Sequence, residues 1–345
     1  MTKAPAALGA ILCVALRLGI LATLGERAVG FPMAAFLPRA CRHGFGGRQA
    51  SFYRAGTVAA RMASNTTDVG AGVVGGGEIL ASKRPGSLPA DLATWFDVSL
   101  PEGRCIGVKT ANETACFPQS PPGTELEPDH WIRSFFHSDE IEFGMTLKQT
   151  RNSFWLGRLA MRMALGYPGY PIVRDYYGRP RLREGAFGSI SHKKGRGVAL
   201  ASHSVADPGL PGAIFSGVGV DLEMTSRPGR PSLAKRVLTA SERESLGGIP
   251  GIAADEEVLL RFSLKEAIYK AAHPLLCQYV GFQEAEVTPL PDGTASCSWL
   301  LESGADDRIA GLTAHWRTID DGAYFLTSAS VFARPDFEGC PLADE

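Results

Sequence analysis

The sequence predicts an α+β fold of two similar lobes, each a helix packed on a small antiparallel sheet. In the first half, apolar residues recur at helical spacing over Thr146–Leu165, and Phe187–Ser202 follows as an expected strand, turn and strand. In the second half, a helix is expected at Glu256–Ala272, and alternating segments with Asp-Gly turns follow it. The shared order of a helix and then strands indicates a weak internal duplication.

The other elements follow from alternation and from turn residues. Short strands are expected at Trp95–Leu100 and Arg104–Thr110, on either side of a Pro-Glu-Gly turn. A buried strand at Ile214–Leu222 and a helix at Leu233–Leu246 open the second lobe, and Pro274 is expected to end the longer helix. The second lobe closes with four alternating segments: Val280–Pro289, Thr294–Leu301, Leu312–Thr318 and Ala323–Ala333.

Composition limits the classes of function. The chain has 345 residues, of which 45% are hydrophobic, enough to build the cores of two modest lobes. Its 35 Lys and Arg residues nearly balance its 36 Asp and Glu residues, so no nucleic acid partner is expected. The seven cysteines are scattered without CxxC spacing, which argues against a zinc site and a disulfide framework and favours a reducing compartment.

Residues 1–63 are expected to be a targeting leader. Ala4–Leu24 has the form of a signal sequence, but Arg17 interrupts the clean run of about 20 apolar residues that a membrane-spanning helix needs. Residues 30–63 contain no acid and are rich in Arg, Ala and Gly, as transit peptides are. The two segments together resemble the bipartite leader of plastid proteins, and no membrane span is expected in the mature protein. A mitochondrial presequence, a wrongly chosen start codon and a cytoplasmic protein remain alternatives.

The rest of the chain divides by composition. Residues 64–87 are rich in Gly, Ala, Ser and Thr; part of this stretch matches GxGxxG, but without a preceding strand it indicates a flexible linker rather than a phosphate loop. Residues 88–210 are expected to form the N-terminal lobe and residues 211–335 the C-terminal lobe with the metal site. Residues 336–345 are expected to be a tail.

A strand and a helix carry the candidate metal site. In GVGVDLE, Asp221 and Glu223 share one face of the strand while Leu222 points the other way. In FSLKEAIYK, Glu266 and Lys270 lie one helical turn apart. Ligands that are all oxygen favour Mg²⁺ or Mn²⁺ over zinc. Considered alone, the Glu–Lys pair is also an ordinary ion pair worth ~0.3–0.5 kcal/mol.

Basic groups elsewhere are candidates for binding phosphate. His192 follows Ser191 at a strand end beside two lysines, and Arg179 lies in a turn. Three arginines of the first helix form a row that is either an anion site or a solvated basic face: Arg151, Arg158 and Arg162. No nucleophile with a partnering base stands out. The residues therefore indicate metal-assisted transfer at a phosphate, with the nucleophile supplied by the substrate.

The order and spacing of these motifs resemble the signature of the 4′-phosphopantetheinyl transferases. GVGVDLE precedes FSLKEAIYKA by the family's spacing (266 − 221 = 45), and GR, GRP, GSISH and LTxxE also match. The likeness spans Leu88–Ala333 and is to the two-lobed surfactin/enterobactin type, which implies lobes related by a pseudo-twofold with the active site between them. The implied enzyme is a holo-[acyl-carrier-protein] synthase.

The resemblance also implies the reaction. The serine hydroxyl of an apo acyl or peptidyl carrier protein attacks the β-phosphate of coenzyme A, the phosphopantetheine arm moves to the serine, and adenosine 3′,5′-bisphosphate leaves. The enzyme is expected to be a monomer that serves fatty-acid, polyketide or peptide synthesis. Two alternatives are a Mg²⁺-dependent nuclease or phosphohydrolase, and a non-catalytic membrane-anchored binding protein.

The resemblance further implies residue roles. The implied Mg²⁺ ligands are Asp221, Glu223 and Glu266. The implied contacts to coenzyme A are Arg158, Arg179, Ser191, His192 and Lys270. The implied catalytic residues are Glu266 as base, Lys270 at the leaving group, and Glu242 as a second candidate base or contact to a metal-bound water; Lys265 belongs to the signature without a clear role. Carrier proteins present acidic helices, so a basic docking surface is expected, or else a solvated loop, at Arg227, Arg230, Lys235 and Arg236.

Overall fold

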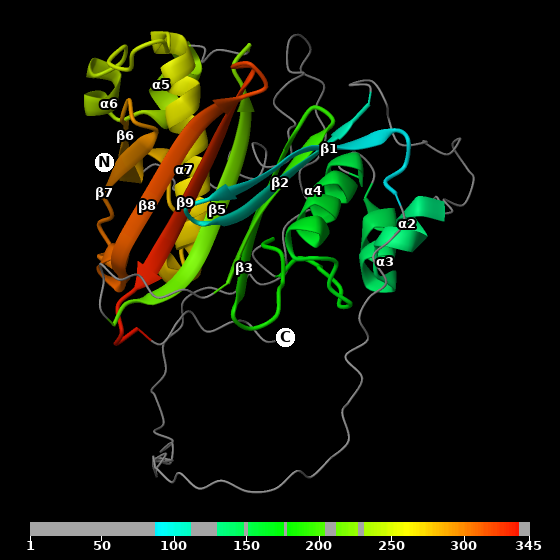
Figure 1. Ribbon diagram of the computed structural model, residues 1–345. Coiled ribbons are helices and arrows are strands. Elements are labelled where there is room, and N and C mark those ends of the chain that lie inside the picture. Colours follow the sequence, from blue (N-terminus) through cyan, green and yellow to red (C-terminus); the bar gives the residue numbers. More distant parts are fainter. Residues whose placement is uncertain are drawn as a thin grey trace, which may run out of the picture. The chain divides into compact units, whose positions relative to one another are not determined.

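The structure is a computed structural model that describes residues 87–111, 130–147, 151–175, 178–203, 212–226 and 231–337 (Figure 1). The expected leader, all but the last residue of the expected linker and most of the expected tail lie outside these residues. Arg227 and Arg230 also lie outside them. Within the described ranges, no helix combines the length and the apolar character that a membrane crossing requires.

The N-terminal lobe is a four-stranded antiparallel sheet in the order β1-β2-β4-β3, with helix α4 (Arg151–Ala164) packed on it (Figure 1). Trp155, Leu156 and Leu159 form the buried stripe of α4. Two short helices, α2 (His130–Phe135) and α3 (Ser138–Thr146), pack beside it. The strands are β1 (Leu92–Leu100), β2 (Gly103–Thr110), β3 (Ala186–Lys193) and β4 (Arg196–His203).

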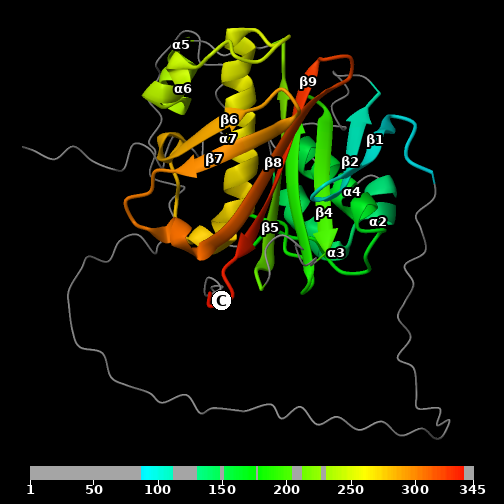
Figure 2. The same cartoon turned by 60° about the vertical axis from the view of Figure 1, so that its left-hand side comes forward.

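The C-terminal lobe is a five-stranded antiparallel sheet in the order β5-β9-β8-β7-β6. Helix α7 (Ala254–Leu276) packs across β5 and β9 (Figure 2), as α4 packs on the first sheet. The predicted α+β fold with two lobes is therefore confirmed. The strands are β5 (Ile214–Met224), β6 (Ala285–Pro289), β7 (Thr294–Trp299), β8 (Ile309–Ile319) and β9 (Tyr324–Ala333), with short 3-10 turns η4 (Phe282–Glu284) and η5 (Ala305–Arg308).

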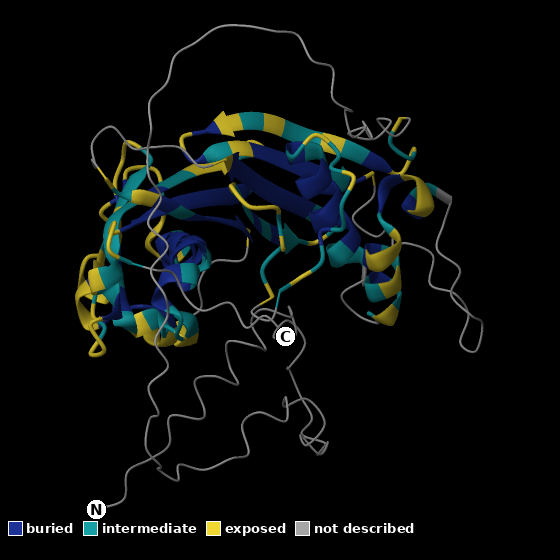
Figure 3. Ribbon diagram, turned by 90° about the horizontal axis from the view of Figure 1, so that it is seen from below, coloured by how far each residue is buried: buried dark blue, intermediate teal, exposed yellow. Residues whose placement is uncertain are grey.

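A core shared by both lobes lies between the two sheets. Val198 and Leu200 of β4 meet Val220 and Leu222 of β5, and Leu326 of β9 joins them. Figure 3 shows the central strands and α7 as buried, in dark blue. Burying apolar surface contributed by both lobes favours one fixed arrangement of the sheets. The strand β5 therefore contacts apolar residues on one face and presents its other face to α7 and β3.

Pro274 lies inside α7 rather than ending it. The helix continues to Leu276 and ends at Cys277, whose φ of 53° is left-handed. Leu275 and Leu276 are buried in the core of the C-terminal lobe, and this packing favours a last helical turn despite the proline. The expected end of the helix at Pro274 was therefore wrong.

The segment predicted as one helix over Leu233–Leu246 forms two helices, α5 (Pro231–Val237) and α6 (Ala240–Glu244). Thr239 separates them because it is the N-cap of α6. Its side chain accepts a hydrogen bond from the amide of Glu242, and the Glu242 carboxylate accepts one from the amide of Thr239. Such a capping box starts a new helix at a fixed residue.

The cysteines differ from expectation at one position. Cys105 and Cys297 are free, but Cys277 is disulfide-bonded. A disulfide needs Cα atoms within about 7 Å, a condition that sequence spacing cannot reveal.

Candidate active site

Helix α7 and strand β5 approach each other so closely that only glycine fits between them. A Cβ atom on Gly219 would lie 1.8 Å from the carbonyl oxygen of Ala267, and one on Gly217 would lie 2.3 Å from that of Ala271. The glycines of GVGVDLE thus let the helix backbone rest on the strand. This contact brings polar side chains of α7 onto the carboxylate at the end of the motif.

Asp221 is the centre of the site and is only 5% exposed. Lys270 Nζ lies 2.7 Å from its Oδ1, and Ser191 Oγ donates to the same oxygen over 2.8 Å. Ser263 Oγ donates to Oδ2 over 2.9 Å. Burial by itself raises the pKa of Asp221, but the charge and hydrogen bond of Lys270, together with the serine hydroxyls, outweigh it and hold this pKa below its usual value. Asp221 is therefore a carboxylate in the folded protein.

Glu223 lies two residues further along the same face of β5 and is bound by Lys193. The lysine Nζ lies 2.6 Å from Oε2 and 2.8 Å from Oε1. Burial raises the pKa of Glu223 to about 7; Lys193 opposes this shift, and the charge of Asp221 adds to it. The sequence prediction put Glu223 just past the strand, whereas it lies within β5.

The site lies where β3 of one lobe meets β5 of the other. Ser189, Ser191 and Lys193 alternate along β3 and so project from one face. Ser189 Oγ accepts a hydrogen bond from the amide of Val220 over 3.0 Å, while the other two reach Asp221 and Glu223. Candidate site residues of the two lobes therefore meet where β3 lies against β5.

Glu266 lies on α7, one turn before Lys270, and is half-buried. Lys270 donates to Asp221 and, over 3.0 Å, to the carbonyl oxygen of Val220, so its role extends beyond an ordinary pair along the helix. In the part of the chain that the structure describes, no three His, Cys, Asp or Glu side chains are gathered closely enough to hold a metal. Asp221, Glu223 and Glu266 are therefore not gathered into one shell, and two of them, Asp221 and Glu223, are paired with lysines.

The donor set nevertheless fits a hard divalent cation. Asp221 and Glu223 are neighbouring buried carboxylates, and the charge of Asp221 raises the pKa of Glu223. Mg²⁺ binds oxygen ligands and commonly takes only one or two carboxylates, completing its shell with water and phosphate. The lysines that now hold these carboxylates would then face the phosphate oxygens.

His192 follows Ser191 on β3 and is half-buried. The pKa of its ring is lowered to about 4, mainly by burial and in second place by the nearby charge of Lys270. The ring is therefore neutral at pH 7. Arg179 lies in a turn, where its Nε is 2.6 Å from a carboxylate oxygen of Asp175.

The row of arginines on α4 is not a solvated basic face. Arg162 is buried and forms an ion pair of 2.6 Å with the buried Glu140 of α3. Arg158 is also buried, over the ring of Phe154, and its Nε has no hydrogen-bond partner among the described residues. Burial lowers the pKa of Arg158 to about 10. The side chain of Arg151 lies outside what the structure describes.

Glu242 has a structural set of partners. Besides capping α6, its carboxylate accepts from Lys265 Nζ over 2.6 Å and from the amide of Val287 over 2.7 Å. Lys265 also donates to two backbone carbonyl groups, those of Val237 and Phe282. Both side chains are buried, and together they fasten α6 and β6 to α7. The oxygens of Glu242 are occupied by these partners, which favours a structural role over the role as base or metal-water contact that the resemblance implied.

Several residues of the site were missed by the sequence prediction. Ser263 belongs to the FSLKE motif, so its place in the motif was the available signal. Lys193 is one of the two lysines beside His192, and the available signal was strand alternation, which puts it on the same face as Ser191. Thr327 of β9 had no signal, since it belongs to no motif.

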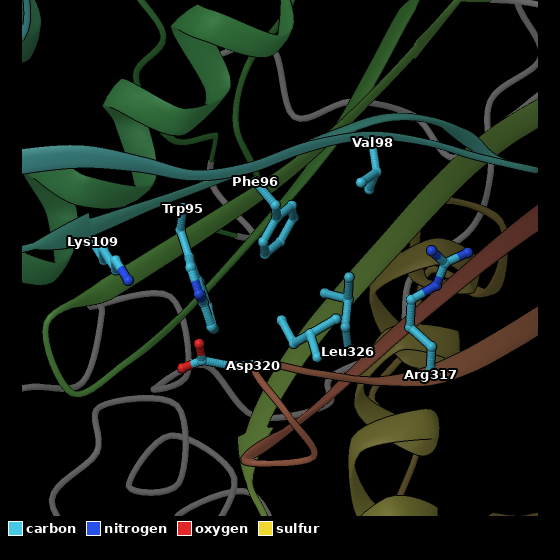
Figure 4. A pocket seen from close by; sticks show the side chains of 8 residues that line it. Trp95, Phe96, Val98, Lys109, Arg317, Asp320 and Leu326 are labelled. Atoms are coloured by element: carbon cyan, nitrogen blue, oxygen red, sulfur yellow. The ribbon is translucent and has the colours of Figure 1, made fainter.

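A cavity of about 320 Å³ lies away from these residues, between β1 and the ends of β8 and β9 (Figure 4). Trp95, Phe96 and Leu326 form apolar parts of its wall, and Lys109 and Arg317 are its cations. None of the predicted site residues lines it. The cavity is therefore not the candidate active site.

Two family models match the chain. The model for the 4′-phosphopantetheinyl transferase superfamily matches residues 217–317, which include the β5 and α7 motifs, and the model for the 4′-phosphopantetheinyl transferase N-terminal domain matches residues 143–202. The chain belongs to the 4′-phosphopantetheinyl transferase superfamily. It is thus a transferase enzyme with 4′-phosphopantetheinyl transferase activity.

The chain is also similar to individual proteins. The 4′-phosphopantetheinyl transferase Svp of Streptomyces mobaraensis is 28% identical over 219 residues, covering 60% of this chain and 82% of its own. The 4′-phosphopantetheinyl transferase Npt of Nocardia iowensis is 29% identical over 198 residues, covering 55% and 80%. A solved structure of a Chronobacterium ammoniagenes ACPS-CoA complex is 24% identical with a TM-score of 0.26, covering 34% of this chain and 96% of its own.

Proposed function

We propose that the protein is a Mg²⁺-dependent holo-[acyl-carrier-protein] synthase, which transfers 4′-phosphopantetheine from coenzyme A to a serine of an acyl or peptidyl carrier protein. The observation that carries the proposal is the pair of buried carboxylates on β5, each held by a lysine. In such a site the carboxylates can neutralise a bound cation, and the lysines can neutralise phosphate oxygens. Mn²⁺ is an alternative cation, since the same oxygen ligands suit it.

Some residues of the site are proposed to stabilise negative charge, and one is proposed to accept a proton. A bound divalent cation would neutralise the oxygens of the pyrophosphate. Lys270 and Lys193 lie at the carboxylates and supply positive charge for the attacked phosphate and the leaving group. Glu266, half-buried on the same helix, is the proposed acceptor of the serine proton. The bond from the serine oxygen to the β-phosphorus forms, and the bond from that phosphorus to the leaving bisphosphate breaks.

Basic groups of the N-terminal lobe are the proposed contacts to the rest of coenzyme A. Arg158 offers a buried guanidinium whose Nε lacks a partner among the described residues. A neutral His192 donates a single ring N–H, and a bound phosphate dianion would favour its protonated form. Arg179 is the third proposed contact. Ser191, whose hydroxyl donates to Asp221, supports the carboxylate as well.

Incubation of the protein with coenzyme A, Mg²⁺ and several apo carrier proteins tests the proposal. Intact-mass spectrometry is expected to show one phosphopantetheine arm on the carrier, on a tryptic peptide that contains its serine. Replacing this serine by alanine in the carrier is the control and should abolish the gain in mass. Hydrolysis of DNA without coenzyme A, with no modified carrier, would instead support a phosphohydrolase.

The pH dependence of Mg²⁺ binding is expected to follow Glu223. The pKa of Glu223 is raised to about 7 and that of Asp221 is lowered, so of these two carboxylates only Glu223 takes up a proton between pH 8 and 6. A cation binds the ionised carboxylate and must displace this proton. The apparent affinity for Mg²⁺ should therefore fall below pH 7, by about tenfold per pH unit at the limit. Calorimetry in the presence of coenzyme A measures this slope.

The Glu223→Gln variant is the control for that titration. Its affinity for Mg²⁺ should be weaker and nearly independent of pH over the same range, because the titrating group is absent. An equal slope in the variant and in the parent protein would assign the titration to another group.

Carrier docking is proposed at the basic end of α5. Lys235 and Arg236 are exposed in its last turn, whereas the other two residues of the expected surface are not described. The double variant K235E/R236E is expected to raise KM for an acidic carrier severalfold with little change in KM for coenzyme A, since rim charges act mainly on encounter with the partner. Arg334→Glu, a charge reversal at another exposed residue, is the matched control. An unchanged KM for the carrier would remove α5 from the docking surface.

A further inference from the structure

A chain of hydroxyl groups leads from β9 through α7 to Asp221. Thr327 stands directly opposite Asp221 in the β5–β9 ladder. Thr327 Oγ1 lies 2.9 Å from Ser263 Oγ, which in turn lies 2.9 Å from Asp221 Oδ2. Thr327 Oγ1 also donates to the backbone carbonyl of Ser263 over 3.0 Å. Thr327 and Ser263 are fully buried, so water cannot replace either hydroxyl without a change in packing.

The direction of these hydrogen bonds follows from the charge of Asp221. With Lys270 Nζ 2.7 Å from Oδ1, the aspartate is ionised and can only accept. The single proton of Ser263 therefore points to Oδ2. Thr327 must then be the donor to Ser263, and it shares its proton between the oxygen atoms of the serine side chain and backbone. Hydrogen bonds aligned in one direction polarise and strengthen one another.

The two oxygens of Asp221 are supported unequally. Oδ1 accepts from both Ser191 and Lys270, whereas Oδ2 accepts from Ser263 alone among the described residues. A carboxylate has about four lone-pair sites, so the one that stays open belongs to Oδ2. The hydrogen bond from Ser263 occupies one lone pair of Oδ2 and so fixes the direction of the open one. The hydrogen bond from Thr327 fixes the orientation of the Ser263 hydroxyl.

We propose that Ser263 and Thr327 are positioning residues, which orient the free lone pair of Asp221 Oδ2 toward the divalent cation. This inference rests on the proposed function, because it assigns the cation to Asp221. Outer partners of this kind align ligands before the metal arrives, and their loss commonly weakens metal binding by about 10–100-fold. In variants that lack the hydroxyl of Ser263 or Thr327, Lys270 and Ser191 still bind Oδ1 of Asp221. The carboxylate would therefore stay buried, but the lone pair of Oδ2 would lose its fixed direction.

Binding of Mn²⁺ to the full chain in the presence of coenzyme A, followed by electron paramagnetic resonance of the free ion, tests the proposal. Ser263→Ala is expected to raise Kd for Mn²⁺ about tenfold or more. Thr327→Val keeps the shape of the side chain and should raise Kd by about threefold, since Ser263 then lacks its donor. Thr327→Ser restores the hydroxyl and should bring Kd back to within about twofold. The KM for the carrier protein should not change in any of them.

Ser330→Ala is the matched control, since it removes a buried hydroxyl of β9 that pairs with Thr313 over 2.7 Å on the opposite face of the strand. It should leave Kd for Mn²⁺ unchanged, and a loss equal to that of Thr327→Val would overturn the proposal. Unchanged Kd in Ser263→Ala and Thr327→Val, beside a large loss in Asp221→Asn, would also overturn it while leaving the proposed function standing. Unchanged Kd in Asp221→Asn would contradict the proposed metal site itself.

Discussion

Replacing Asp221 by asparagine is expected to slow transfer by about 10³-fold, which corresponds to about 4 kcal/mol of lost transition-state stabilisation. The amide is neutral, so it binds a cation weakly and leaves Lys270 without its nearby carboxylate. Its shape is retained, but the amide has a single acceptor oxygen, so one serine hydroxyl keeps its acceptor and the other must turn to accept from the amide NH2. The fold should persist. Transfer of a labelled arm to a carrier measures the rate, and circular dichroism checks the fold.

Asp97→Asn is the control for this change, since Asp97 forms an exposed ion pair with Arg104 on the first sheet. Exposed pairs contribute little, and this variant should keep full activity. Activity of Asp221→Asn within a few-fold of the parent protein would contradict the assignment of the site.

Gly219→Ala is expected to destabilise the fold by about 3 kcal/mol or more. The added methyl group would lie 1.8 Å from the carbonyl oxygen of Ala267, so α7 would have to move away from β5. Such a shift also separates Ser263 and Lys270 from Asp221, and activity should fall with stability. The midpoint of chemical denaturation measures the free energy of unfolding.

Gly248→Ala serves as the comparison for Gly219→Ala. Its added methyl group would meet only the carbonyl oxygen of Ser245, at an ordinary 3.5 Å, in an exposed connection between α6 and α7. Its effect should stay within about 1 kcal/mol. A similar loss for both variants would show that the contact between helix and strand is not the reason GVGVDLE carries its glycines.

The sequence predicted the elements of the fold well where the pattern was local. Alternation identified the strands that became β3, β4 and β9, and helical spacing identified α4 and α7. The errors arose where tertiary contacts outweighed local preference. Buried leucines carried α7 past Pro274, and a capping box at Thr239 divided a continuous helical pattern.

The site was predictable in its motifs but not in its partners. Asp221, Glu223 and Lys270 were named from their motifs, and alternation placed the two acids on one face. The sequence could not show that Lys193 would hold Glu223, because β3 and β5 meet only when the lobes fold together. Helical spacing put Arg162 in a row of arginines, but it could not show that the buried Glu140, distant in the sequence, would pair with Arg162. Thr327 reaches Asp221 through a sheet register that no motif encodes.

If Asp221 holds the Mg²⁺ that contacts coenzyme A, binding of the cation and binding of coenzyme A are coupled. Calorimetric titration of coenzyme A into the metal-free protein and into the Mg²⁺-loaded protein gives two dissociation constants. The proposed Mg²⁺ site predicts at least tenfold tighter binding of coenzyme A with Mg²⁺, about 1.4 kcal/mol of coupling, and no such gain in Asp221→Asn. Equal affinity with and without Mg²⁺ in the parent protein, or an equal gain in the variant, would show that Asp221 does not hold a cation that contacts coenzyme A.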